Sequence, residues 1–126
     1  MFEGRAEEAI QLYMSLFPRS EICHLVKYGP EAGANEGAIK HAEIFLNGQR
    51  VAFADSPVPH TFTFTPSLSL YVECESEAEL EQCATQLGEG GQLLMPPGSY
   101  GFSTRFAWLN DRFGVSWQLN FQLGMV

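Results

Sequence analysis

Two residues of the segment KHAEI have the types and the spacing that a divalent metal ion needs. His41 and Glu43 are two positions apart, so their side chains would project from the same face of a β-strand. Imidazole and carboxylate groups are both metal ligands, and Asp55, at the end of VAFAD, could supply a third. Phe53 would point the same way as Asp55, because side chains alternate along a strand. The alternative is that His41 and Glu43 form a polar pair on a partly solvated sheet.

A second polar group lies in FAWLNDRFGVSWQLNF, where two apolar runs flank residues 111–114. Asp at the start and Gly at the end of these four residues are typical of a β-turn. If Asn110 faces Val115, then Trp108 faces Trp117 on an apolar core face. The opposite face then carries four polar residues, which are Arg105, Ser116, Gln118 and Asn120. That face looks either at water or into a cavity that holds a ligand.

Covalent catalysis finds little support. No serine lies in a Gly-x-Ser-x-Gly motif, and Cys23 and His24 are neighbours that would point to opposite faces of a strand. The three cysteines are odd in number and lack Cys-x-x-Cys spacing. We therefore interpret Cys23, Cys74 and Cys83 as buried, reduced thiols of a cytoplasmic protein.

The elements that must position these residues follow from hydrophobic periodicity. GRAEEAIQLYMSLFP predicts a helix that Pro18 ends, and EICHLVKYG predicts a strand. AIKHAEIFLNGQRVAFAD predicts a hairpin, because Asn47-Gly48 is a preferred two-residue turn. FTPSLSLYVECES predicts a further strand, SEAELEQCATQLGEGG a helix and GQLLM a short strand. The second helix has Ser76 as its expected N-cap and Glu79 as the capping-box partner.

The order of these elements indicates an α+β fold built from two βαβββ modules within a single domain of residues 1–126. The modules cover about residues 1–64 and 65–126. The first strand of module one is largely missing, since only Met1 and Phe2 precede the first helix. We expect that residues upstream are absent from this numbering. Both helices can cover one face of the sheets and leave the other face concave.

Composition narrows the classes of function. The chain has 126 residues, of which 45% are hydrophobic, so it can form a globular core. Its net charge of -8 repels phosphate backbones and disfavours nucleic-acid binding. No apolar run is long enough to span a membrane, and no signal peptide is visible. We therefore expect a cytoplasmic protein that binds neither nucleic acid nor membranes.

The predicted order of elements resembles the vicinal oxygen chelate superfamily of glyoxalases, bleomycin-resistance proteins and extradiol dioxygenases. FEGRAEEAIQLYMSLFPRSEI and YGFSTRFAWLNDRFGVSWQLNF, with LNGQRVAFAD and TPSLSLYVECES between them, resemble its PhnB-like branch. The resemblance implies a cup-shaped mixed sheet with helices on the outer face. This branch is often labelled 3-demethylubiquinone-9 3-methyltransferase. The sequence does not support methyl transfer, because it lacks a glycine-rich strand-to-helix turn for S-adenosylmethionine.

The resemblance also implies positions for metal ligands on four strands that face into the cup. The second position falls on Asp55, the third at or near Ser69 and the fourth on Gln118, while the first lies on the nearly absent strand. Serine and glutamine are poor ligands, and glyoxalase-type chemistry needs a metal to stabilise an enediolate. We therefore expect no obligatory metal or other cofactor, although a divalent ion at His41, Glu43 and Asp55 stays open.

If the resemblance holds, the cup binds a small, partly aromatic or polar metabolite or drug. The candidate ligand-binding residues are His41, Glu43, Phe53, Asp55, Ser69, Arg105, Gln118 and Asn120. Arg105 would bind an anionic or carbonyl group, or would instead form an ion pair with Glu43 or Asp55. One alternative is a metal-dependent lyase, isomerase or dioxygenase. Another is an interaction protein whose sheets exist mainly to dimerise.

We expect a homodimer, because the superfamily commonly pairs modules within or between chains. Two loops carry exposed aromatic residues that could meet a second subunit or cover the cup. The first loop contains Phe62 and Phe64, and the second contains Tyr100 and Phe102.

Overall fold

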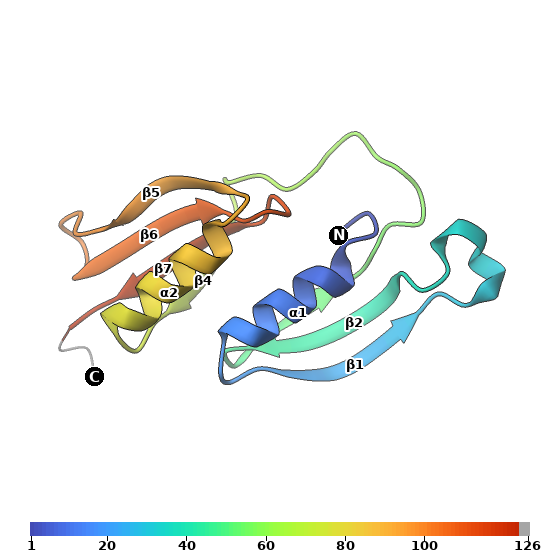
Figure 1. Ribbon diagram of the computed structural model, residues 1–126, viewed down its shortest axis with the longest axis horizontal. Coiled ribbons are helices and arrows are strands. Elements are labelled where there is room, and N and C mark those ends of the chain that lie inside the picture. The colour runs from blue at the N-terminus through green and yellow to red at the C-terminus, as the bar shows by residue number, and fades with distance from the viewer. Residues whose placement is uncertain (124–126) are drawn as a thin grey trace. The chain divides into compact units, whose positions relative to one another are not determined.

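The computed structural model describes residues 1–123, which divide into two compact units (Figure 1). The first unit covers residues 1–61, and the second begins at Phe62. Each unit packs an α-helix against a sheet of its own. The α+β fold class is thereby confirmed. No helix within residues 1–123 has the length and hydrophobicity that crossing a bilayer requires.

The first unit contains a three-stranded antiparallel sheet with the strand order β1-β2-β3. Its elements are α1 (Ala6–Leu16), β1 (Glu21–Lys27), the short 3₁₀ helix η1 (Pro30–Asn35), β2 (Ile39–Leu46) and β3 (Gln49–Phe53). The predicted turn between β2 and β3 is confirmed, with φ angles of 53° at Asn47 and 87° at Gly48. Asparagine and glycine tolerate positive φ, which is why this dipeptide closes the hairpin.

The α1 helix buries one apolar stripe against the sheet. The stripe consists of Ala6, Ala9, Ile10 and Tyr13. The ring of Tyr13 lies 6.0 Å from the ring of Phe53, which in turn stacks on Phe2 at 5.9 Å. This face of β3 is therefore the helix-covered core face.

The residues that precede α1 in the first unit form a parallel bridge. Phe2 pairs with Asp55 in parallel: its amide donates to the Ala54 carbonyl at 2.7 Å, and its carbonyl accepts from Ser56 at 2.6 Å. The bridge joins the start of the unit to the end of β3. The second unit has the same arrangement in full, because its first strand pairs in parallel with its last.

The second unit contains a four-stranded sheet with the order β4-β7-β6-β5, in which only the β4–β7 pair is parallel. Its elements are β4 (Leu70–Glu73), α2 (Glu77–Gly88), β5 (Gln92–Gly98), β6 (Arg105–Asn110) and β7 (Ser116–Phe121). This is the predicted βαβββ order. The β5 strand is longer than expected because it includes Pro96 and Pro97, which an edge strand with an irregular register tolerates.

The α2 helix begins with the predicted cap. Ser76 Oγ accepts a hydrogen bond from the Glu79 amide at 3.0 Å, and Glu79 Oε2 accepts from the Glu75 amide at 2.9 Å. The return bond thus reaches the residue before the cap. The buried face of the helix consists of Leu80, Cys83, Ala84 and Leu87.

Candidate functional site

The register of the β6–β7 hairpin differs by one residue from the prediction. Asn110 pairs with Ser116, not with Val115, so Trp108 lies opposite Gln118 and Leu109 opposite Trp117. Residues that face each other across an antiparallel pair point to the same side of the sheet. The prediction that Trp108 and Trp117 share one face is therefore wrong.

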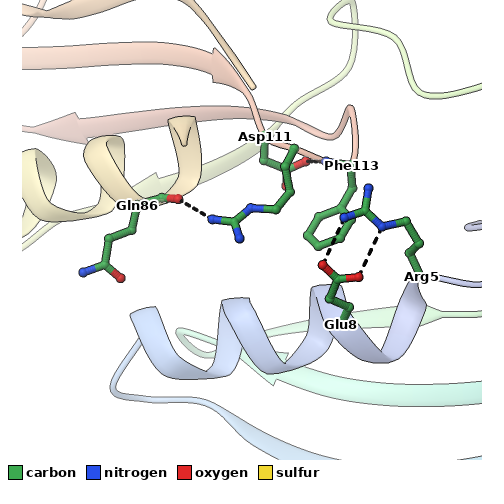
Figure 2. A network of polar contacts seen from close by, with 6 residues as sticks. Arg5, Glu8, Gln86, Asp111 and Phe113 are labelled. Atoms are coloured by element: carbon green, nitrogen blue, oxygen red, sulfur yellow. Dashed lines mark hydrogen bonds and ion pairs between the residues drawn. The ribbon is translucent and has the colours of Figure 1, made fainter. Parts of the chain in front are cut away.

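The shift comes from the turn itself (Figure 2). Asp111 Oδ1 accepts a hydrogen bond from the Phe113 amide at 2.9 Å, which Figure 2 shows. It also accepts one from the Val115 amide at 3.0 Å. Gly114 has a φ of 93°, and its amide donates to the Asp111 carbonyl at 3.0 Å, so the turn ends in a glycine bulge. The bulge leaves Val115 opposite Asp111, whose amide donates to the Val115 carbonyl at 2.9 Å. Asp111 Oδ2 also accepts from Trp117 Nε1 at 2.9 Å, which anchors the start of β7.

Arg105 consequently lies on the helix-covered face and not beside Gln118. It shares this face with Ala107, and its Nε donates to Glu81 Oε1 of α2 at 2.6 Å. The expected ion pair with Glu43 or Asp55 is not the one formed. Any anion-binding role for Arg105 would require it to leave Glu81.

The open face of the second sheet, defined as the face away from α2, carries a connected set of uncharged polar groups. The hydroxyls of Ser69 and Ser116 lie 2.6 Å apart, and Trp108 Nε1 donates to Ser116 Oγ at 2.9 Å. Gln118 Nε2 donates to Ser69 Oγ at 3.4 Å. The structure thus brings the predicted residues Ser69 and Gln118 together, and it adds Trp108, which sequence reasoning had assigned to the core.

A second group on the open face contains the predicted residue Asn120. Its Nδ2 donates to both carboxylate oxygens of Glu73, at 3.1 and 3.3 Å. Burial, followed by the charge of Glu73 and a hydrogen bond to it, raises the pKa of Tyr71 above its usual value. Tyr71 lies opposite Gln118, so this group continues the Ser69–Gln118 set along β4 and β7. Tyr71 and Glu73 are two residues apart in the predicted strand, so their side chains share one face, and this spacing could have indicated the group from the sequence.

Aromatic rings extend the open face beyond the polar groups. Phe106 is opposite Asn120, and the rings of Phe102 and Tyr100 pack edge-on against Phe106 at 4.8 and 6.4 Å. The loop that carries Tyr100 and Phe102 therefore folds onto its own unit. Its predicted aromatic residues contact the candidate site and not only solvent.

In the first unit, two predicted site residues belong to the helix-covered face. Phe53 lies opposite the buried Ala42 and packs against Tyr13. Asp55 is 2% exposed, and its carboxylate accepts hydrogen bonds from three backbone amides within the described residues 1–123. The expectation that Phe53 and Asp55 face the same side as His41 is therefore wrong.

The Asp55 carboxylate caps the N-terminus of α1. Gly4 and Ala6 donate to Oδ1 at 2.8 and 3.0 Å, and Ile39 donates to Oδ2 at 2.9 Å. The N-cap residue Arg5 makes no side-chain cap of its own, so Asp55 supplies the missing acceptor and a favourable negative charge at the helix start. Both oxygens are thus used structurally.

His41 and Glu43 do share a face, as predicted, on the side of the first sheet away from α1. His41 Nε2 lies 3.7 Å from Glu43 Oε1, and Arg50 lies 3.8 Å from Glu43 Oε2. The ring of His24 lies 5.6 Å from that of His41. Among residues 1–123, no three His, Cys, Asp or Glu side chains are grouped so that they could hold a metal ion. Asp55 does not complete such a group.

The cysteines only partly match the expectation. Cys74 and Cys83 are buried, but Cys23 is exposed at an irregularity in the β1–β2 pairing. A hydrogen bond between the two buried thiols raises the pKa of Cys74 and lowers that of Cys83, while burial opposes ionisation of both.

Comparison with known proteins assigns the chain to a family. The model of the 3-demethylubiquinone-9 3-methyltransferase family matches residues 1–120. A PhnB protein from Bacillus cereus with the same methyltransferase description is 52% identical, with a TM-score of 0.90 over 96% of this chain and 94% of that one. Protein PA1353 from Pseudomonas aeruginosa is 25% identical, with a TM-score of 0.83 over 96% of this chain and 92% of that one. No curated protein sequence matches the chain.

More distant structures share the fold alone. The fosfomycin resistance protein FosX from Listeria monocytogenes is 10% identical, with a TM-score of 0.60 over 98% of this chain and 88% of that one. A glyoxalase/bleomycin resistance protein/dioxygenase from Nocardioides is 17% identical, with a TM-score of 0.54 over 100% of this chain and 82% of that one. The chain therefore belongs to the 3-demethylubiquinone-9 3-methyltransferase family, a PhnB-like group with the vicinal oxygen chelate fold.

Proposed function

We propose that this protein binds a small, partly aromatic metabolite or drug on the open face of its second sheet. The observation that carries the proposal is the half-buried Trp108 beside the hydroxyls of Ser69 and Ser116 and the amide of Gln118. An indole ring offers apolar contact area, and a few convergent polar groups orient a ligand. This combination is typical of small-molecule sites.

Binding without an obligatory metal is part of the proposal. Ser69 and Gln118 are poor metal ligands, and Asp55 already accepts three backbone amides. Vicinal oxygen chelate enzymes that use a metal would need a stronger donor set. The donors of these described residues therefore do not fit a resident metal ion.

Methyl transfer is not part of the proposal, because a methyl donor does not fit the structure. Nucleotide-like cofactors bind where a glycine-rich turn leads from a parallel strand into a helix. Here the β4–α2 connection consists of Cys74, Glu75 and Ser76, and the first helical turn carries Glu77 and Glu79. This connection contains no glycine, so it does not form such a turn.

The two tryptophans make binding measurable in one spectrum. Trp108 lies on the open face, whereas Trp117 is 1% exposed and hydrogen-bonded to Asp111. In a ¹H–¹⁵N spectrum recorded with fractionated metabolite extract, the Trp108 indole signal should shift and the Trp117 signal should not. The Trp108→Phe variant assigns the signal, and native mass spectrometry identifies the bound compound by its mass.

A matched control tests whether the polar groups take part. Gln118→Leu should weaken binding of that compound, whereas Gln82→Ala, on the exposed side of α2, should leave it unchanged. Failure of every fraction to shift the Trp108 signal would overturn the proposal. Uptake of a divalent ion in native mass spectrometry would favour the metal-dependent alternative instead.

The expected homodimer and the cytoplasmic location remain predictions. Light scattering on purified protein measures the oligomeric state directly. A ligand that binds only the folded state must raise the melting temperature of the protein. A dimer whose melting temperature no metabolite fraction raises would therefore favour the interaction-protein alternative.

A further inference from the structure

The open face of the second sheet has a definite charge. Within the four strands β4 to β7, charged side chains are carried by Glu73 and Arg105 alone. Arg105 points to the helix side and is held by Glu81, whereas Glu73 points to the open face and contacts Asn120. The one charged group that these strands present to the open face is therefore a carboxylate.

The same face contains a buried acceptor without a donor. Asn120 is 6% exposed, and its Nδ2 must be the atom nearest Glu73, because a carboxylate accepts hydrogen bonds and does not donate them. This fixes Oδ1 as the other amide atom. Oδ1 is buried and receives no hydrogen bond within the described residues 1–123. A buried acceptor without a hydrogen bond destabilises the folded protein, and a hydrogen bond from a ligand would remove that penalty.

We infer that the ligand is an aromatic compound that carries a hydrogen-bond donor, and preferably a positive charge, rather than an anion. Glu73 attracts the charge, Asn120 Oδ1 accepts the donor, and the half-buried ring of Trp108 contacts the aromatic part. The inference rests on the proposed function and names the ligand class of the same site. It replaces the anionic ligand that Arg105 would have selected.

A set of three matched probes tests this class. 2-Naphthylmethylamine, 2-naphthaleneacetamide and 2-naphthaleneacetate share one ring system and differ in charge and donor capacity. Titrations followed by the Trp108 indole signal should rank them as ammonium, amide and carboxylate, from tightest to weakest. The ammonium should bind about tenfold more tightly than the carboxylate, the scale of one charge pair near a protein surface.

Isosteric variants separate charge from shape. Glu73→Gln keeps an acceptor for Asn120 Nδ2 but removes the charge, so the preference for ammonium over carboxylate should fall to about twofold or less. Glu89→Gln removes the same charge from an exposed position after α2 and should leave the preference unchanged. Unchanged melting temperatures would exclude unfolding as the cause.

The possible outcomes are distinct. Equal or tighter binding of the carboxylate, or a preference that Glu73→Gln does not alter, would overturn the ligand class and leave the proposed function standing. If no probe shifts the Trp108 signal, the ligand class is wrong. The metabolite-extract experiment then decides the proposed function separately, because it assumes nothing about charge.

Discussion

Asp55 is the residue whose role changes most between sequence and structure. As a carboxylate after a strand, it had the chemistry of a metal or ligand contact. In the folded unit it is buried and accepts hydrogen bonds from Gly4, Ala6 and Ile39. One side chain thus ties together the start of α1 and the start of β2.

This role predicts a loss of stability in Asp55→Ala. The change leaves three amides without their acceptor and removes the negative charge at the start of α1, so the free energy of unfolding should fall by about 3 kcal/mol. Urea denaturation followed by circular dichroism measures it. The exposed loop variant Glu36→Ala is the control and should change stability by less than about 0.5 kcal/mol. A variant of Asp55 as stable as this control would contradict the capping role.

At the scale of elements, the Asp111 turn decides which residues form the candidate site. The glycine bulge at Gly114 shifts β7 by one position relative to a simple four-residue turn. A one-residue shift moves every side chain of a strand to the other face. The bulge therefore places Trp108 beside Gln118 on the open face. It also places Arg105 on the helix-covered face, where it forms a hydrogen bond with Glu81 of α2.

The positive φ of Gly114 predicts the effect of replacing it. Gly114→Ala should destabilise the protein by about 1 kcal/mol, because a Cβ is unfavourable in this backbone conformation. The added atom would lie 3.8 Å from the Phe64 ring, an ordinary contact, so the cost comes from the backbone. Gly114→Asn should cost less, since asparagine tolerates this region better. Thermal melting of the two variants tests the order, and equal losses would indicate that φ does not govern the turn.

At the scale of the whole molecule, the binding proposal predicts how the protein responds to a chelator. If no metal is obligatory, dialysis against EDTA should leave both the melting temperature and the binding of the identified metabolite unchanged. Differential scanning calorimetry and a repeated titration measure these quantities. Loss of either, with recovery on addition of a single divalent metal, would favour the metal-dependent alternative.

Local features of the sequence determined the elements of this protein. The helices, the Asn47-Gly48 turn, the Ser76 cap and the βαβββ order depend on residues close together in the chain, and all are confirmed. The match to the family model agrees with the resemblance found in those segments. Periodicity and capping act over a few residues, which is why a single sequence suffices to recognise them.

Only the tertiary structure decided which polar side chains meet when they lie far apart in the chain. His41 and Glu43 are two residues apart, and their shared face was predictable from strand alternation. The orientation of Asp55 depends on amides about fifty residues earlier in the chain, and that of Arg105 on Glu81 of a packed helix. Strand pairing has a period of two residues, so a bulge of one residue reverses the faces while the local pattern stays the same.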